Sequence, residues 1–169
     1  MTRAATTLVH ASVRRASAAI KLVAASHATA RPYNPRKTYT PAELEPYDAL
    51  CDRFVRAVET AIKFFRTVEL LEYAEQSDTV RDLLNRVAKR GLISSPELWL
   101  CMRDARNRIV HDYLPEDLHA LHNDLQGPFA AELMRLADQL PRYDAATAEP
   151  QQCVVNHKKV RKSTARNGR

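Results

Sequence analysis

An arginine, a histidine and a tyrosine stand at fixed offsets in the octet Arg106-Asn107-Arg108-Ile109-Val110-His111-Asp112-Tyr113. A guanidinium stays charged at every physiological pH and can hold a phosphate, while an imidazole exchanges a proton near neutrality. Metal-free cleavage of a phosphodiester needs both abilities. Arg106 and His111 are therefore the candidate residues for such chemistry.

The octet is predicted to lie on a helix. Ser94-Ser95-Pro96-Glu97 combines a capping box with an early proline, and apolar residues follow at helical spacing. At roughly 100° per residue, Arg106 and His111 are separated by about 140° on a straight helix. The side chains of Arg106 and His111 in a single protomer would thus not easily reach the same phosphate. We therefore expect a homodimer in which two copies of this helix line one cleft, with Leu100 and Leu114 at the interface.

The remaining segments also predict helices. Apolar residues recur at helical spacing from about Pro46 to about Glu75, and a short helix capped by Ser77 or Asp78 should end at Gly91. A leucine-rich stripe stays in phase across Gly127-Pro128, which predicts one kinked helix or two abutting helices, closed by Pro141. The expected fold is an all-α, antiparallel, four- to five-helix up-and-down bundle.

Charge divides the chain into three parts. The net charge is +6, but residues 1–42 hold seven Lys/Arg and no acid, residues 43–140 hold twelve against eighteen, and residues 141–169 hold seven against two. We expect a bundle over residues 44–140, a disordered basic arm over 1–43 and a disordered basic tail over 141–169. The arm also resembles an organellar transit peptide, and we favour the disordered extension.

Within the acidic middle, a local excess of basic residues surrounds the octet. We expect RNA contacts from five of them: Arg86, Lys89, Arg90, Arg103 and Arg108. The structural alternative for Arg106 is an ion pair with Asp104, Asp112 or a carboxylate of a neighbouring helix.

Other chemistries find less support in the sequence. The three cysteines include no C-x-x-C pair, so we expect neither a zinc site nor a disulfide framework, and a reducing cytoplasm is the natural compartment. His119 and His122 lack a convincing third ligand, and we expect no metal or cofactor. No run of about 18 apolar residues predicts a membrane span.

Arg106-x4-His111-x-Tyr113, with Asn107 directly after the arginine, resembles the signature of HEPN domains, and particularly of HepT-type toxins encoded beside a minimal nucleotidyltransferase antitoxin. Gly91-Leu92-Ile93, followed by Trp99 and Met102, is similar to the related nucleotidyltransferase substrate-binding proteins. The resemblance covers about residues 47–140.

This resemblance implies a homodimeric, metal-independent endoribonuclease with a composite site at the dimer interface. Arg106 would bind the scissile phosphate, His111 would shuttle a proton, and Asn107 would orient one of them. The nucleotidyltransferase antitoxin would neutralise the toxin by transferring AMP to Tyr113, because a bulky anion there would repel RNA. The alternative is a noncatalytic substrate-binding subunit of a nucleotidyltransferase.

Overall fold

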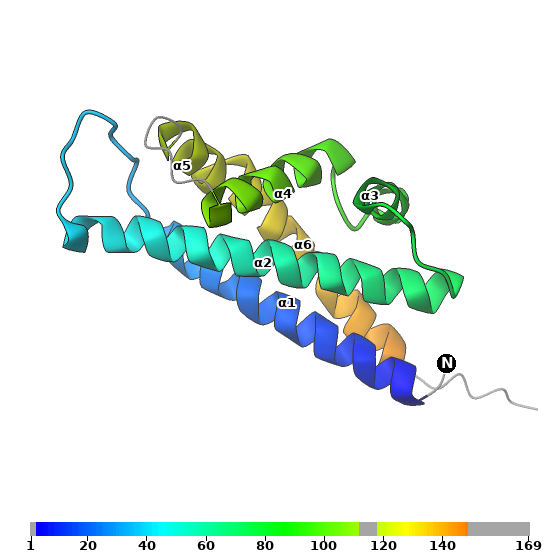
Figure 1. Ribbon diagram of the computed structural model, residues 1–169. Coiled ribbons are helices and arrows are strands. Elements are labelled where there is room, and N and C mark those ends of the chain that lie inside the picture. The colour runs from blue at the N-terminus through cyan, green and yellow to red at the C-terminus, as the bar shows by residue number, and fades with distance from the viewer. Residues whose placement is uncertain (1–2, 112–117, 149–169) are drawn as a thin grey trace, which may run out of the picture.

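The computed structural model describes residues 3–111 and 118–148, and within these ranges α-helices joined by loops are the only regular secondary structure. The prediction of an all-α bundle is confirmed. The six helices are α1 Arg3–Thr29, α2 Pro41–Tyr73, α3 Val80–Lys89, α4 Pro96–His111, α5 Leu118–Gln126 and α6 Pro128–Ala148. The two long helices α1 and α2 form a hairpin, α6 packs on α1, and α3, α4 and α5 each contact α2 (Figure 1).

The N-terminal segment is part of the folded domain. The prediction that residues 1–43 form a disordered arm is wrong, because α1 packs against both α2 and α6. Its buried residues recur at alternating spacings of four and three: Val9, Val13, Ala16, Ile20 and Val23. That spacing gives the helix one apolar stripe, and the basic side chains between these positions are exposed.

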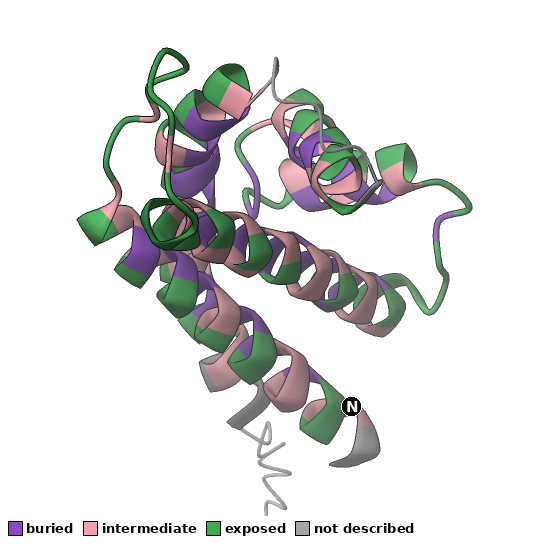
Figure 2. Ribbon diagram, turned by 60° about the vertical axis from the view of Figure 1, so that its left-hand side comes forward, coloured by how far each residue is buried: buried purple, intermediate pink, exposed green. Residues whose placement is uncertain are grey.

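Helix α2 is the central element of the bundle. Thr40 caps its first turn in a capping box with Glu43, and Pro41 occupies a position where a missing N–H does no harm. The helix therefore starts five residues before the predicted Pro46, which lies inside it. It ends where Ala74 adopts the left-handed conformation. Figure 2 shows buried positions recurring along α2, and these run from Leu50 to Glu69 at helical spacing.

The C-terminal stripe forms two helices. Gly127 separates α5 from α6, and a Cβ at that position would lie 2.9 Å from the carbonyl oxygen of Asn123, so the tight junction requires glycine. Helix α6 continues through Pro141 to Ala148, and the predictions of a stop at Pro141 and of disorder directly after it are wrong. The ring of Tyr143 packs edge-on against Phe64 with ring centroids 5.4 Å apart, which fixes the first of the added turns on the core.

The short helix α3 and the turn after it pack beside α2 and α4. Thr79, one residue after the predicted caps, accepts a hydrogen bond from the Asp82 N–H and starts α3. Gly91 adopts the predicted positive φ of 72° after α3. Within the described ranges, no helix has the length and hydropathy needed to cross a membrane.

The integration of α1 predicts a measurable contribution to stability. Replacing the buried Ile20 by alanine removes core packing of α1 and should lower the free energy of unfolding by about 2–5 kcal/mol. Replacing Leu22, which is 44% exposed on the same helix, should change it by less than about 0.5 kcal/mol. Urea unfolding followed by circular dichroism measures both, and equal small effects would show that α1 is not part of the cooperative fold.

Candidate functional site

Helix α4, which carries the octet, is anchored at its N-terminal end by a buried carboxylate. Ser95 caps the helix by accepting a hydrogen bond from the Leu98 N–H, so the cap is Ser95 rather than a box between Ser94 and Glu97. Glu132 of α6 accepts hydrogen bonds from the Ser94 N–H at 2.9 Å and from Trp99 Nε1 at 2.8 Å. Arg135 donates to the same carboxylate at 3.0 Å. These bonds fix the start of α4 relative to α6.

The environment of Glu132 keeps this carboxylate charged. Burial alone would raise the pKa of Glu132, but the hydrogen bonds from Arg135, Ser94 and Trp99 together outweigh burial and hold the pKa below its ordinary value of 4.5. Because the folded-state pKa is depressed, the stabilisation is present above the ordinary pKa and is lost as the pH falls through the folded value.

A groove of about 390 Å³ lies between α2 and α4, beside the middle of the octet helix. Three of its lining side chains are cations and one is a carboxylate, so its charge is positive. The lining residues are Val58, Glu59, Ile62, Lys63, Arg103, Arg106 and Asn107. A groove of this size and charge can accept a phosphate group and the sugar attached to it.

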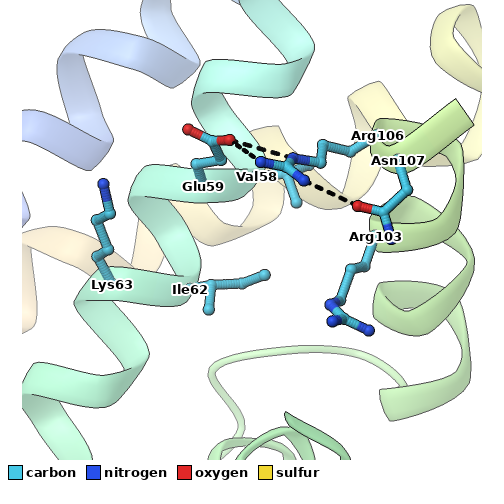
Figure 3. Close-up of a pocket in the computed structure, with 7 residues that line it drawn as sticks. All are labelled: Val58, Glu59, Ile62, Lys63, Arg103, Arg106 and Asn107. Atoms are coloured by element: carbon cyan, nitrogen blue, oxygen red, sulfur yellow. Dashed lines mark hydrogen bonds and ion pairs between the residues drawn. The ribbon is translucent and has the colours of Figure 1, made fainter. Parts of the chain in front are cut away.

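Arg106 reaches across this groove to α2, as Figure 3 shows. Its Nε donates to Glu59 Oε1 at 3.1 Å, and its Nη2 donates to the same oxygen. The third nitrogen, Nη1, donates to Asn107 Oδ1 at 2.8 Å. The Arg106 side chain is 29% exposed. Its guanidinium is therefore oriented by two side chains and remains accessible from the groove.

The pairing of Arg106 with Glu59 realises one alternative that the sequence left open, a carboxylate of a neighbouring helix. Glu59 itself was missed by sequence reasoning. It follows the buried Val58 on α2 and precedes Lys63 by one helical turn, which in a sequence reads as an ordinary solvated pair. Only the packing of α4 on α2 reveals that this carboxylate faces the octet.

The structure brings together Arg103, Arg106 and Asn107 among the predicted site residues. His111 is the last residue of α4, five positions after Arg106, and its side chain is outside the described part of the chain. Tyr113 and Leu114 also fall outside the described residues. Leu100, predicted at a dimer interface, is half-buried against the core of its own chain.

Two predicted RNA-binding arginines are engaged by carboxylates of α2. Arg86 donates to the buried Glu69 at 3.1 Å, and Arg90 pairs with Glu72. Both guanidinium groups also lie over the ring of Tyr73, at 5.1 and 5.2 Å. These contacts fasten α3 to the end of α2, which gives both arginines a structural role. Lys89 and Arg108 are exposed on α3 and α4.

Thiols and metal ligands are scattered over the described part of the chain. Cys51 and Cys101 are both free, and burial raises the pKa of the Cys51 thiol to about 12, so this thiol is unreactive near neutrality. Residues 3–111 and 118–148 contain no group of three His, Cys, Asp or Glu side chains placed to hold a metal ion.

Comparison with known protein families assigns the chain to one family. Residues 11–142 match the model of a family described as nucleotidyltransferase substrate binding protein like. Because this match covers most of the sequence, the chain belongs to that family. The match begins inside α1, whereas the resemblance seen in the sequence began near residue 47, so α1 is part of the family domain. No curated protein matches the chain significantly.

The buried carboxylate of α6 predicts a pH-dependent stability. Glu132→Gln keeps the acceptor oxygen but removes the charge, and should lower the free energy of unfolding at pH 7 by about 1–3 kcal/mol. The difference from the unsubstituted protein should shrink as the pH falls from the ordinary carboxyl pKa of 4.5 through the lower folded-state pKa, because the unfolded chain takes up a proton first and the native carboxylate only at the lower pH. Urea unfolding across this pH range measures both proteins, and a pH-independent difference would contradict the charged role of Glu132.

Proposed function

We propose that this chain is the partner subunit of a nucleotidyltransferase, and that its α2–α4 groove binds a phosphate of an RNA substrate. The observation that carries the proposal is the orientation of Arg106 by Glu59 and Asn107 at the edge of a groove with three cations and one carboxylate. The family assignment supports a nucleotidyltransferase as the partner.

The ion pair with Glu59 determines how such a phosphate would bind. Glu59 is 37% exposed and Arg106 is 29% exposed, so solvent weakens their attraction. An incoming phosphate would exchange with the Glu59 carboxylate for the Nε and Nη2 donors, because a guanidinium binds either group through the same pair of nitrogens. Arg103 lies one helical turn before Arg106 and supplies a further cation to the groove.

This binding mode predicts opposite effects for two substitutions in one ion pair. With a short single-stranded RNA as probe, Arg106→Ala should weaken binding about three- to tenfold and reduce the slope of log affinity against log salt by about one. Glu59→Gln should strengthen binding, since it removes the competing carboxylate. Fluorescence anisotropy at several salt concentrations measures both effects.

Lys21→Ala is the matched control, because Lys21 is exposed on α1 and does not line the groove. Its effect on the salt slope should be smaller than that of Arg106→Ala. Unchanged affinity and salt slope in Arg106→Ala would remove the groove from RNA binding.

A second candidate function is a metal-independent endoribonuclease of the HepT toxin type, acting as a homodimer. Its support is that Arg106 and Asn107 share one groove and that His111 follows on the same helix. Val110, beside His111, is 50% exposed and offers α4 an apolar contact with a second copy. In this function His111 moves the proton, Arg106 stabilises the charge on phosphorus, and a nucleotidyltransferase antitoxin silences the site by AMP transfer to Tyr113.

Two measurements separate the candidates. RNA incubated with the purified protein in the presence of a chelator should be cut by a ribonuclease and left intact by a binding subunit, and cutting should disappear in Arg106→Ala and His111→Ala. Intact mass after incubation with the partner and ATP should rise by one adenylyl group, except in Tyr113→Phe. Cleavage retained in both variants, or modification retained in Tyr113→Phe, would contradict the assigned roles.

A further inference from the structure

Three aromatic rings form a stack at the end of the molecule where the α1–α2 connection lies near α5 (Figure 1). His122 of α5 stacks on Tyr33 with centroids 5.0 Å apart, and Tyr33 stacks on Tyr39 at 5.1 Å with an interplanar angle of 11°. The ring of Tyr47, on α2, lies edge-on to all three, at 5.1 to 5.5 Å. None of these rings belongs to the α2–α4 groove.

The stack ends at a pocket. A hollow of about 340 Å³ is lined by Thr29, Arg31, Lys37, Tyr39, Glu43, Pro46 and Tyr47. Tyr39 and Tyr47 line it, whereas Tyr33 and His122 do not. The Lys37 ammonium lies over the Tyr39 ring, 4.8 Å from its centroid. Because Tyr33 covers one face, the ammonium lies over the remaining face.

Two hydrogen bonds within the chain hold the tyrosine rings of the stack in place. The Asn34 N–H donates to Tyr39 Oη at 2.8 Å, and Tyr47 Oη donates to the Pro32 carbonyl oxygen at 3.3 Å. Burial lowers the pKa of His122, against the opposing effect of Asp48, so this ring is neutral near pH 7 and stacks as an uncharged aromatic. A rigid aromatic platform loses little entropy when a flat ligand adds to it.

The charges around the pocket favour an anion. Arg31 and Lys37 are both exposed, and Glu43 is the opposing carboxylate. Lys37 donates to Glu43 at 2.8 Å, and this bond, with those from Thr40, lowers the pKa of Glu43 to about 2. The Lys37 side chain is 47% exposed, so its ammonium can leave the ring and Glu43 at little cost.

We propose that this pocket binds a nucleotide, with the base stacked on the outer face of Tyr39 and the phosphate held by Arg31 and Lys37. The base continues the stack of His122, Tyr33 and Tyr39 in the place that the Lys37 ammonium now occupies, and the displaced ammonium moves to the phosphate. Aromatic stacking tolerates any base, and the arginine and lysine supply the charge that a phosphate requires. The bound nucleotide is either a free nucleotide or one residue of an RNA strand.

The test uses the full-length protein with AMP and with a short oligoadenylate as probes, titrated by calorimetry. Tyr39→Ala should weaken binding at least about tenfold, while Tyr39→Phe, which keeps the ring, should bind within about threefold of the unsubstituted protein. Arg31→Gln should weaken binding and flatten its salt dependence. Glu43→Gln should tighten it, because glutamine preserves the capping box and releases Lys37.

Controls separate this pocket from the α2–α4 groove. AMP affinity should be unchanged in Lys21→Ala, an exposed position on α1 that lines neither cavity. The loss of AMP binding caused by Tyr39→Ala should persist when Arg106→Ala is also present, so failure of the groove as an RNA site leaves this result intact. Circular dichroism measures whether Tyr39→Ala is folded. Tyr39-dependent binding of AMP identifies a free nucleotide as a ligand, and Tyr39-dependent binding of the oligoadenylate alone identifies RNA. Binding of neither probe, or affinities unchanged in both Tyr39→Ala and Arg31→Gln, would overturn the proposal.

Discussion

The burial of α2 on several sides is the constraint on which the other helices depend. Its apolar residues extend from Leu50 to Val68, and they pack against α1 on one side and against α3, α4 and α5 elsewhere. The buried positions of α2 form one broad apolar stripe, and such a helix gains its stability when other helices cover that stripe. The partners of α2 can therefore vary in length, but each must bring an apolar stripe to it. The α2–α4 groove exists because α4 meets α2 beside the polar edge that carries Glu59 and Lys63.

Much of the fold could be predicted from local patterns. The all-α class, the long central helix and the left-handed turn at Gly91 follow from periodicity and from residue types that act within a few positions. The basic, acid-free composition of the first 42 residues favours disorder, but the spacing of Val9, Val13, Ala16 and Ile20 gives α1 an apolar stripe that the bundle buries. Pro141 predicts the end of the helix, but α6 continues about two turns further, and Tyr143 packs on Phe64 in the first of them.

The candidate site was less predictable, because its contacts join residues far apart in the sequence. Arg106 and Asn107 could be found from the motif, but Glu59 is 47 positions away from Arg106 and lies on another helix. Glu132, which anchors α4, is 33 positions from Trp99. Arg86 and Arg90 were grouped with the octet by charge alone, and tertiary packing instead pairs them with carboxylates of α2. The sequence shows which residues are charged, but the packing of the helices decides which of them form ion pairs.

Lys63 lies between two hollows of α2. It lines the groove that α2 forms with α4, and also a smaller hollow of about 90 Å³ that α2 forms with α1, together with Arg15. One ammonium thus borders both faces of the same helix, so the position of the Lys63 side chain sets the charge of the two hollows together.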